Sequence, residues 1–142
     1  MNEKVLLVDD EVEFLEAMSE RLRLRDMEVK TATNAEDALA MLGEEQFDAV
    51  FLDLQMPGTD GIKGLKMIKN MNPNLQVIFL TGHATVEKGI QAMKLGAMDF
   101  MEKPVDINVL SEKIHKAKAR KMLLVGKEAE ARISEILSSK TW

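Results

Sequence analysis

The sequence predicts an α/β domain of the doubly wound class, in which a five-stranded parallel sheet carries helices on both of its faces. Predicted strands, most of them short apolar runs, alternate with segments of helical periodicity five times along the chain. These runs are continuous rather than alternating, which is typical of strands that are covered on both faces. With 142 residues, 46% of them hydrophobic, the chain is long enough for one domain with a sizeable core.

The first two strand–helix units contain a buried strand and the most polar strand. The run VLLV at residues 5–8 predicts a buried strand, and a helical pattern over residues 12–25 follows it. The second strand, EVKTA at residues 28–32, is more polar, so we expect it at an edge of the sheet. Asn34 is a suitable N-cap and predicts a helix that ends near Gly43.

The third and fourth units have the same organisation. AVFL at residues 49–52 predicts a strand, and the turn MPGTDG leads into a helix that ends at about Met71. VIFL at residues 77–80 predicts the next strand. A helix over about residues 86–95 follows, and Gly96 can end it as a C-cap.

The fifth unit is a short strand near residues 99–102 and a last helix that Asp106 can cap. Residues 119–142 lie outside the alternating pattern, but some of their apolar residues are spaced as on one helix face: Met122, Val125, Ala129, Ile133 and Ile136. Two interpretations stay open, a tail that packs on the domain or frays, and a dimerising or docking helix. We expect a domain at residues 1–120 and a helical extension or linker at residues 121–142.

Charge and composition exclude several classes of protein. The net charge of -5 disfavours nucleic-acid binding that depends on neutralising phosphates. Cysteine is absent, so no disulfide framework or thiolate site is expected. No apolar run approaches a membrane helix, and the N-terminus lacks the pattern of a signal peptide. We expect a cytoplasmic domain that binds neither nucleic acid nor membrane directly.

Chemically active side chains follow the predicted strands at the point where each strand ends. Each has an ordinary interpretation by itself, such as an N-cap for Asp10. The carboxyl ends of parallel strands meet at one edge of a sheet, which is where ligands of such folds bind. The residues that follow the strands are therefore expected on one rim: Asp9, Asp10, Asp53, Thr81 and Lys103.

A cluster of carboxylates requires a cation. Two carboxylates about 4 Å apart repel by about 4 kcal/mol at an effective dielectric constant near 20. Lys103 supplies one positive charge, and an all-oxygen site suggests Mg²⁺ for the rest, or Mn²⁺ in its place. Because Mg²⁺ held by carboxylates commonly completes its shell with phosphoryl oxygens, the rim suggests phosphoryl chemistry with an aspartate as acceptor.

The ordered motifs VDD (8–10), FLDLQMPGTDG (51–61), LTG (80–82) and EKP (102–104) resemble the receiver domain of bacterial two-component response regulators. The resemblance covers about residues 3–120. The run from LTGHATVEKG to MDFMEKP is most similar to receivers of the nitrogen-regulator type, which often precede an ATPase and a DNA-binding domain. The resemblance implies the flavodoxin-like strand order 2-1-3-4-5.

The resemblance also implies a role for each residue of the rim. Asp53 would accept a phosphoryl group, and Asp9, Asp10, Asp53 and the backbone carbonyl of Gln55 would bind Mg²⁺. Lys103 would pair with the phosphoryl oxygens. Glu11 is not expected to bind the metal, because a carboxylate at the start of the first helix suits the helix dipole.

Further positions are implied to transmit the signal or tune its duration. Thr81 would move its hydroxyl onto the phosphoryl group, and the Gly82 N–H would donate another hydrogen bond. Phe100 matches the switch aromatic, whose inward rotation follows phosphorylation. The Lys103–Pro104 bond is expected to be cis. Two residues beyond Asp53 and Thr81, Gln55 and His83 would flank the path of the hydrolytic water and tune the rate of hydrolysis.

The leading hypothesis is a phosphorylation-activated signalling switch with intrinsic autophosphorylation and autodephosphorylation activity. A sensor histidine kinase or phosphotransfer protein would be the donor. The output, whose partner is unknown, would act through the last helix, the last strand and the helix before it. One alternative is a haloacid-dehalogenase-like, Mg²⁺-dependent phosphohydrolase, and another is a receiver that serves only as a scaffold. The chain could also be the receiver fragment of a transcriptional activator, or a homodimer formed through its last helices.

Overall fold

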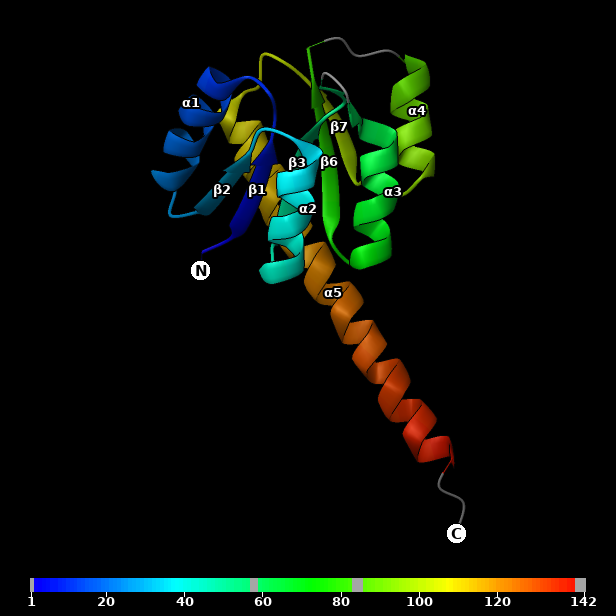
Figure 1. The fold of residues 1–142 in the computed structure, drawn as a ribbon. Helices are drawn as coiled ribbons and strands as arrows, with labels where there is room; N and C mark the ends of the chain where they lie inside the picture. The colour runs from blue at the N-terminus through cyan, green and yellow to red at the C-terminus, as the bar shows by residue number, and fades with distance from the viewer. Residues whose placement is uncertain (1, 57–58, 83–85, 140–142) are drawn as a thin grey trace.

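The computed structural model describes residues 2–56, 59–82 and 86–139 and contains the predicted five-stranded parallel sheet (Figure 1). The strand order is β2-β1-β3-β6-β7, which confirms the predicted order and places the polar second strand at an edge. A two-stranded antiparallel ribbon follows β3. The strands are β1 (Lys4–Val8), β2 (Glu28–Ala32), β3 (Ala49–Asp53), β4 (Gln55–Met56), β5 (Thr59–Asp60), β6 (Gln76–Thr81) and β7 (Asp99–Glu102).

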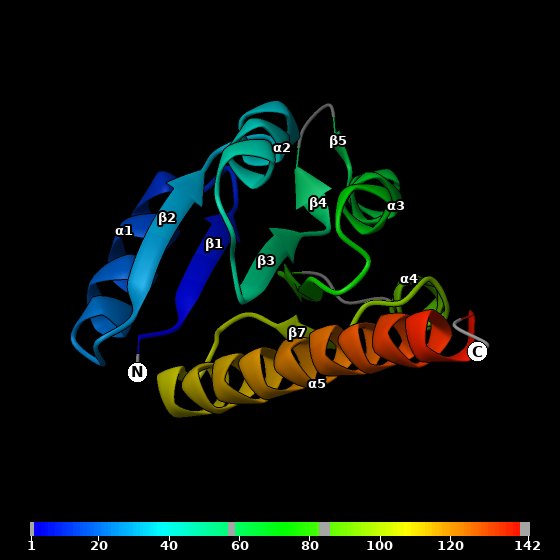
Figure 2. The same ribbon diagram turned by 90° about the horizontal axis from the view of Figure 1, so that it is seen from below.

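Helices cover both faces of the sheet, with α1 and α5 on one face and α2, α3 and α4 on the other (Figures 1 and 2). Successive residues of a strand point to opposite faces. In β1, for example, Leu6 packs towards α2 to α4, whereas Leu7 packs towards α1 and α5. The helices are α1 (Val12–Arg23), α2 (Ala35–Glu44), α3 (Gly61–Met71), α4 (Val86–Lys94) and α5 (Ile107–Ser139).

The helix ends follow the local sequence signals. The Asn34 side chain accepts a hydrogen bond from the Asp37 N–H at 2.8 Å, as predicted for the N-cap of α2. Asp106 accepts from the Asn108 N–H at 2.8 Å at the start of α5. Gly96 has a φ of +100°. The N–H of the following residue, Ala97, reaches back to the carbonyl of Ala92, which is a Schellman C-cap.

The last helix is much longer than the sheet is wide. α5 runs without a break for 33 residues and projects far beyond the domain (Figure 1). Its first three turns are buried through Leu110, Ile114 and Ala117. The apolar residues of its second half are largely exposed, including Met122 at 59% and Ile133 at 57%. No helix among the described residues has the length and apolar character needed to cross a bilayer.

Candidate functional site

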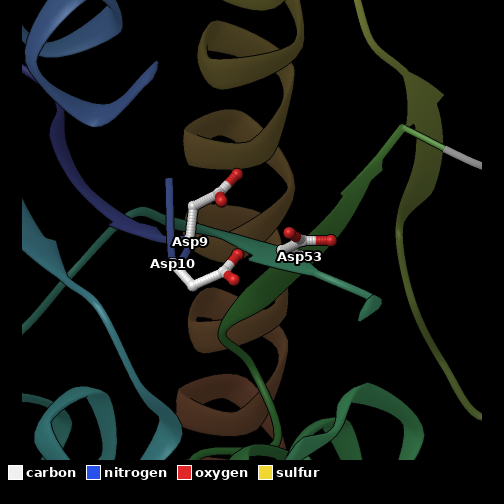
Figure 3. A group of neighbouring side chains, drawn as sticks. All are labelled: Asp9, Asp10 and Asp53. Carbon is white, nitrogen blue, oxygen red and sulfur yellow. The ribbon is translucent and has the colours of Figure 1, made fainter. Parts of the chain in front are cut away.

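Three carboxylates meet at the carboxyl ends of two neighbouring strands. β1 and β3 pair in parallel with Val8 opposite Leu52, so the residues that come next, Asp9 and Asp53, lie side by side at the strand ends. Asp10 lies one residue further along the first strand–helix turn. Figure 3 shows the three side chains gathered at this edge, with the carboxylate of Asp10 directed towards Asp53. One oxygen of each carboxylate lies within 4.8 Å of the others.

These carboxylates differ strongly in exposure. Asp9 and Asp53 are 2% and 4% exposed, whereas Asp10 is open to solvent. A buried carboxylate is unfavourable unless a cation or hydrogen-bond donors compensate its charge. One oxygen of Asp9 accepts from the Glu11 N–H at 2.9 Å, and its other oxygen pairs with Lys103. The exposed Asp10 gives the cluster a face that a solvated ion can approach.

Lys103 is the cation of the site. Its Nζ lies 2.6 Å from Asp9 Oδ2, 3.1 Å from Glu11 Oε1 and 3.9 Å from Asp53 Oδ2. The ammonium group also lies 4.2 Å from the centre of the Phe14 ring, a cation–π contact. Burial by itself lowers the pKa of Lys103, but the hydrogen bonds with Asp9 and Glu11 outweigh it, and the pKa is raised above its ordinary value. The amine is therefore protonated at neutral pH.

The backbone fixes where Lys103 lies. β7 pairs with β6, and the Lys103 N–H donates to the Thr81 carbonyl at 2.8 Å. The Lys103–Pro104 peptide bond is cis, as expected. The lysine therefore leaves β7 at the same edge of the sheet as the three carboxylates.

The turn after Asp53 is held by a close backbone contact. Gly61 begins α3, and a Cβ atom at this position would lie 2.9 Å from Leu54 Cα, closer than real Cβ atoms approach. Glycine is therefore required for α3 to pack against the end of β3. The Asp60 side chain caps α3 by accepting from the Ile62 N–H at 3.0 Å. Together these contacts define the path of the chain immediately after Asp53.

The residues present fit a small, hard cation. All three side chains offer oxygen, the ligand atom that Mg²⁺ prefers, and their oxygens are close enough to share one ion. Two of the three are buried with one lysine between them, so the cluster carries more negative than positive charge. Gln55 lies in β4, two residues after Asp53, at the same edge.

The two residues expected to switch lie on neighbouring strands. Thr81 ends β6 and is 0% exposed. Phe100 is half-buried in β7 and lies opposite Phe79 of β6. A Cβ atom at Gly89 of α4 would meet the Phe100 ring at 3.8 Å, so this ring lies against α4. Gly82 follows Thr81 and is exposed, and His83 lies outside the described residues.

Sequence reasoning missed two members of the site. Glu11 was assigned only to the helix start, but its carboxylate reaches Lys103, and Phe14 covers the same ammonium group. Glu11 is the N-cap of α1 and Phe14 follows three positions later in its first turn, a spacing that brings both side chains to one face of the helix start. The proximity of that face to a residue about 90 positions later in the chain cannot be read from the spacing alone.

Comparisons with known proteins agree with this arrangement. The family profile described as the response regulator receiver domain matches residues 5–115. The transcriptional regulatory protein ZraR of Salmonella typhimurium is 38% identical over 115 residues, which cover 81% of this chain and 26% of that protein. The C4-dicarboxylate transport transcriptional regulatory protein DctD of Rhizobium meliloti is 31% identical over 134 residues, 94% of this chain and 29% of that protein. The chain thus spans between a quarter and a third of the length of these two relatives.

Solved structures show the same fold. A response regulator receiver domain protein from Clostridium thermocellum has a TM-score of 0.81 and 37% identity, covering 86% of this chain and 98% of that one. NtrX from Brucella abortus, in complex with ATP, has a TM-score of 0.83 and 32% identity, covering 90% of this chain and 29% of that one.

Proposed function

The chain belongs to the response regulator receiver domain family, and on that premise we propose that it is a phosphorylation-controlled switch in which Asp53 accepts the phosphoryl group. One observation carries the assignment of the residue. Asp53 lies at the end of the central strand β3, nearly buried, with the other two carboxylates and Lys103 beside it. The family match also favours this function over the phosphohydrolase alternative.

The proposed reaction is an in-line phosphoryl transfer. A carboxylate oxygen of Asp53 attacks phosphorus and forms a new P–O bond, while the bond to the donor breaks and its electron pair leaves with the donor group. The product is an acyl phosphate. Lys103 lies 3.9 Å from Asp53 Oδ2 and would pair with the oxygens of the transferred group. The donor in the cell would be a sensor histidine kinase or a phosphotransfer protein.

We propose that Asp9, Asp10, Asp53 and the backbone carbonyl of Gln55 hold the metal ion, which is Mg²⁺ or Mn²⁺. When bound, the ion would offset the negative charge that the carboxylates and the phosphoryl group bring together. The support is the convergence of three oxygen donors at one edge of the sheet. The exposed Asp10 makes this edge accessible to a hydrated ion.

The switch would pass from the site to the surface formed by α4, β7 and α5. Thr81 and the Gly82 N–H would turn towards the phosphoryl oxygens, and Phe100 would rotate into the space that Thr81 leaves. Phe100 already lies against α4 at Gly89, so rotation of its ring changes a contact of that helix. Gln55 and His83 would tune the rate at which water removes the phosphoryl group.

The rest of the chain would connect this switch to an output. ZraR and DctD are transcriptional regulators that are longer than this chain, and a transcriptional output domain or partner is the corresponding proposal here. Residues 1–120 would form the receiver, and residues 121–142 a helical extension or linker.

Self-association through the exposed apolar residues of the extension would raise the molar mass measured by light scattering. A mass that is unchanged after Ile133→Glu and Ile136→Glu would reject self-association by this helix.

Intact mass spectrometry tests the phosphoacceptor. The protein is incubated with acetyl phosphate and Mg²⁺, and the expected result is an adduct of about 80 Da that Asp53→Asn abolishes. Omission of Mg²⁺ should reduce the adduct strongly. A wild-type protein that gains no adduct from acetyl phosphate or from a kinase would reject the proposal. An adduct that maps to Asp9 would instead support the phosphohydrolase chemistry.

A further inference from the structure

Lys103 lies closer to two other carboxylates than to Asp53, the proposed phosphoacceptor. Its ammonium group bonds Asp9 at 2.6 Å and Glu11 at 3.1 Å, whereas the oxygen of Asp53 is 3.9 Å away, beyond hydrogen-bonding distance. The Phe14 ring, 4.2 Å away, covers the same group. Neither Glu11 nor Phe14 has a part in the reaction proposed above.

We propose that Glu11 and Phe14 are positioning residues that hold Lys103 in a resting position and thereby slow the phosphorylation of Asp53. The proposal rests on the proposed function of Asp53. The start of α1 would thus help to set the rate at which Asp53 is phosphorylated.

Most of the hydrogen-bond donors of Lys103 are already engaged in the resting state. An ammonium group has three N–H donors, and in the resting arrangement Asp9 and Glu11 take two of them. In the proposed reaction Nζ turns towards Asp53 to meet the phosphoryl group, and this turn weakens the contacts with Glu11 and Phe14. An interaction that is stronger in the resting state than in the transition state raises the barrier of the reaction.

The local structure explains why Glu11 can reach the lysine. The Asp9 side chain accepts from the Glu11 N–H at 2.9 Å and so fixes the Glu11 backbone at the start of α1. The Glu11 side chain is 64% exposed, so its contact is one that a competing anion can displace. Phe14 is half-buried against the core beneath α1, which keeps its ring in place under Nζ. The contact with Glu11 is thus adjustable and the contact with Phe14 is fixed.

The resting contact can be observed without metal or phosphoryl donor. In the metal-free protein, NMR signals of Lys103 Cε and Nζ are expected to move in Glu11→Gln and in Phe14→Leu. Glu13→Gln is the matched control, because it removes one carboxylate from an exposed position of the same helical turn. Unchanged Lys103 signals in Glu11→Gln would overturn the proposal, since Glu11 would then not hold the lysine in solution.

Kinetics test the consequence. With acetyl phosphate and saturating Mg²⁺, Glu11→Gln and Phe14→Leu should each raise the rate constant for Asp53 phosphorylation about twofold to fivefold, the range expected from an exposed ion pair or cation–π contact. The concentrations of Mg²⁺ and donor that give half-maximal rate should stay unchanged. Glu13→Gln should have the wild-type rate.

Glu11→Asp separates contact from charge. The shorter side chain keeps the negative charge but loses the reach to Lys103, so the proposal expects it to behave like Glu11→Gln. A wild-type rate in Glu11→Asp would show that only charge matters, and a slower rate in Glu11→Gln would show that Glu11 assists loading. Either result rejects the resting-position role. Failure of the proposed function itself gives a different result, because the wild-type protein would then not be phosphorylated at all.

Discussion

At the scale of single residues, Thr81 is the residue that we propose to link the site to the rest of the switch. It is 0% exposed and ends the strand that pairs with β7, and Phe100 lies on β7 two residues before the position opposite Thr81. The Lys103 N–H donates to the Thr81 carbonyl at 2.8 Å, so the backbone of Thr81 is tied to the cation of the site. The side chain hydroxyl, not the backbone, is therefore the part that can respond to phosphorylation.

Thr81→Ala should separate the phosphorylation of Asp53 from the conformational change that follows it. The variant keeps Asp53, Lys103 and the metal ligands, so we expect it to gain the phosphoryl adduct within about threefold of the wild-type rate. Without the hydroxyl, the Phe100 ring should stay in its resting position. Intact mass measures the first effect, and NMR of the Phe100 ring before and after phosphorylation measures the second. A phosphorylated variant whose Phe100 signals move as in the wild type would contradict the role of the hydroxyl.

The residues of the rim could be predicted because a parallel sheet brings its strand ends together. Asp9, Asp53 and Lys103 each follow a predicted strand, and that position alone places them on one edge. Glu11 could not be predicted in the same way. It is the N-cap of α1 rather than the residue that follows a strand, and its contact with Lys103 spans 92 positions of the sequence. Such a contact depends on the orientation of α1 on the sheet, which no local pattern records.

At the scale of elements, the end of α1 contains an unfavourable backbone conformation. Asp26 has a φ of 62° and occupies the position after the helix where glycine is most common. The neighbouring N–H groups close the cap, with Met27 donating to the Leu22 carbonyl. The left-handed conformation strains a residue that has a Cβ atom.

Asp26→Gly should therefore stabilise the domain. Glycine removes the strain at φ of 62°, partly offset by the greater freedom of glycine in the unfolded chain, and we expect a net gain of about 0.5–1 kcal/mol in the free energy of unfolding. Urea unfolding followed by circular dichroism measures the change. Asp26→Ala is the control, because it removes the carboxylate and keeps the Cβ strain. Equal stability of the glycine and alanine variants would contradict this explanation.

A hydrogen bond between Glu3 near the N-terminus and His115 of α5 should make the stability of the fold depend on pH. Glu3 Oε1 lies 2.8 Å from His115 Nδ1. Burial by itself raises the pKa of Glu3, but the hydrogen bond with His115 and the charges nearby outweigh it, and the pKa is lowered from its ordinary value of 4.5. A lowered pKa in the folded state means that the ionised carboxylate favours folding.

Because the pKa of Glu3 is lowered in the folded state, its contribution to stability is lost on the acidic side. The stability that Glu3 contributes is fully present above pH 4.5, its unfolded pKa, and is lost as the pH falls through the lower pKa of the folded state. Glu3→Gln should be less stable than the wild type at pH 6, and the difference should shrink as the pH falls below about 4. Urea unfolding across this range measures it, with the exposed Glu20→Gln as control. A difference that is constant with pH would show that the lowered pKa makes no contribution.

The sequence predicts the bounds of the strands more accurately than the structure of the segments that connect them. The predicted strand at residues 99–102 has the observed bounds, because Gly96 before it and Pro104 after it limit where a strand can lie. The ribbon of β4 and β5 was predicted only as a turn, since two-residue strands leave no periodicity to detect. The tail was predicted as a helical face outside the domain, but α5 joins both parts into one helix, which an apolar stripe alone does not reveal.

At the scale of the whole molecule, electrostatics opposes the folded arrangement of the site. The chain has a net charge of -5, and folding brings three of its carboxylates within 4.8 Å of one another beside Lys103. A cation that binds only the folded site relieves this repulsion and shifts the unfolding equilibrium towards the folded protein. Stability should therefore report metal binding even when no phosphoryl group is present.

Thermal unfolding should test the metal site through Asp10. Added MgCl₂ should stabilise the wild type by about 2.7 kcal/mol once the free ion reaches one hundred times its Kd. Asp10→Asn should lose most of this increase, and Asp10 is the informative position because it is exposed, whereas Asp9 and Asp53 are buried beside Lys103 and their loss would also change the metal-free protein. KCl at matched ionic strength controls for screening, which weakens repulsion between charges throughout the molecule. If KCl raised the unfolding temperature as much as MgCl₂ does, or if Asp10→Asn responded like the wild type, the carboxylate cluster would not be a specific metal site.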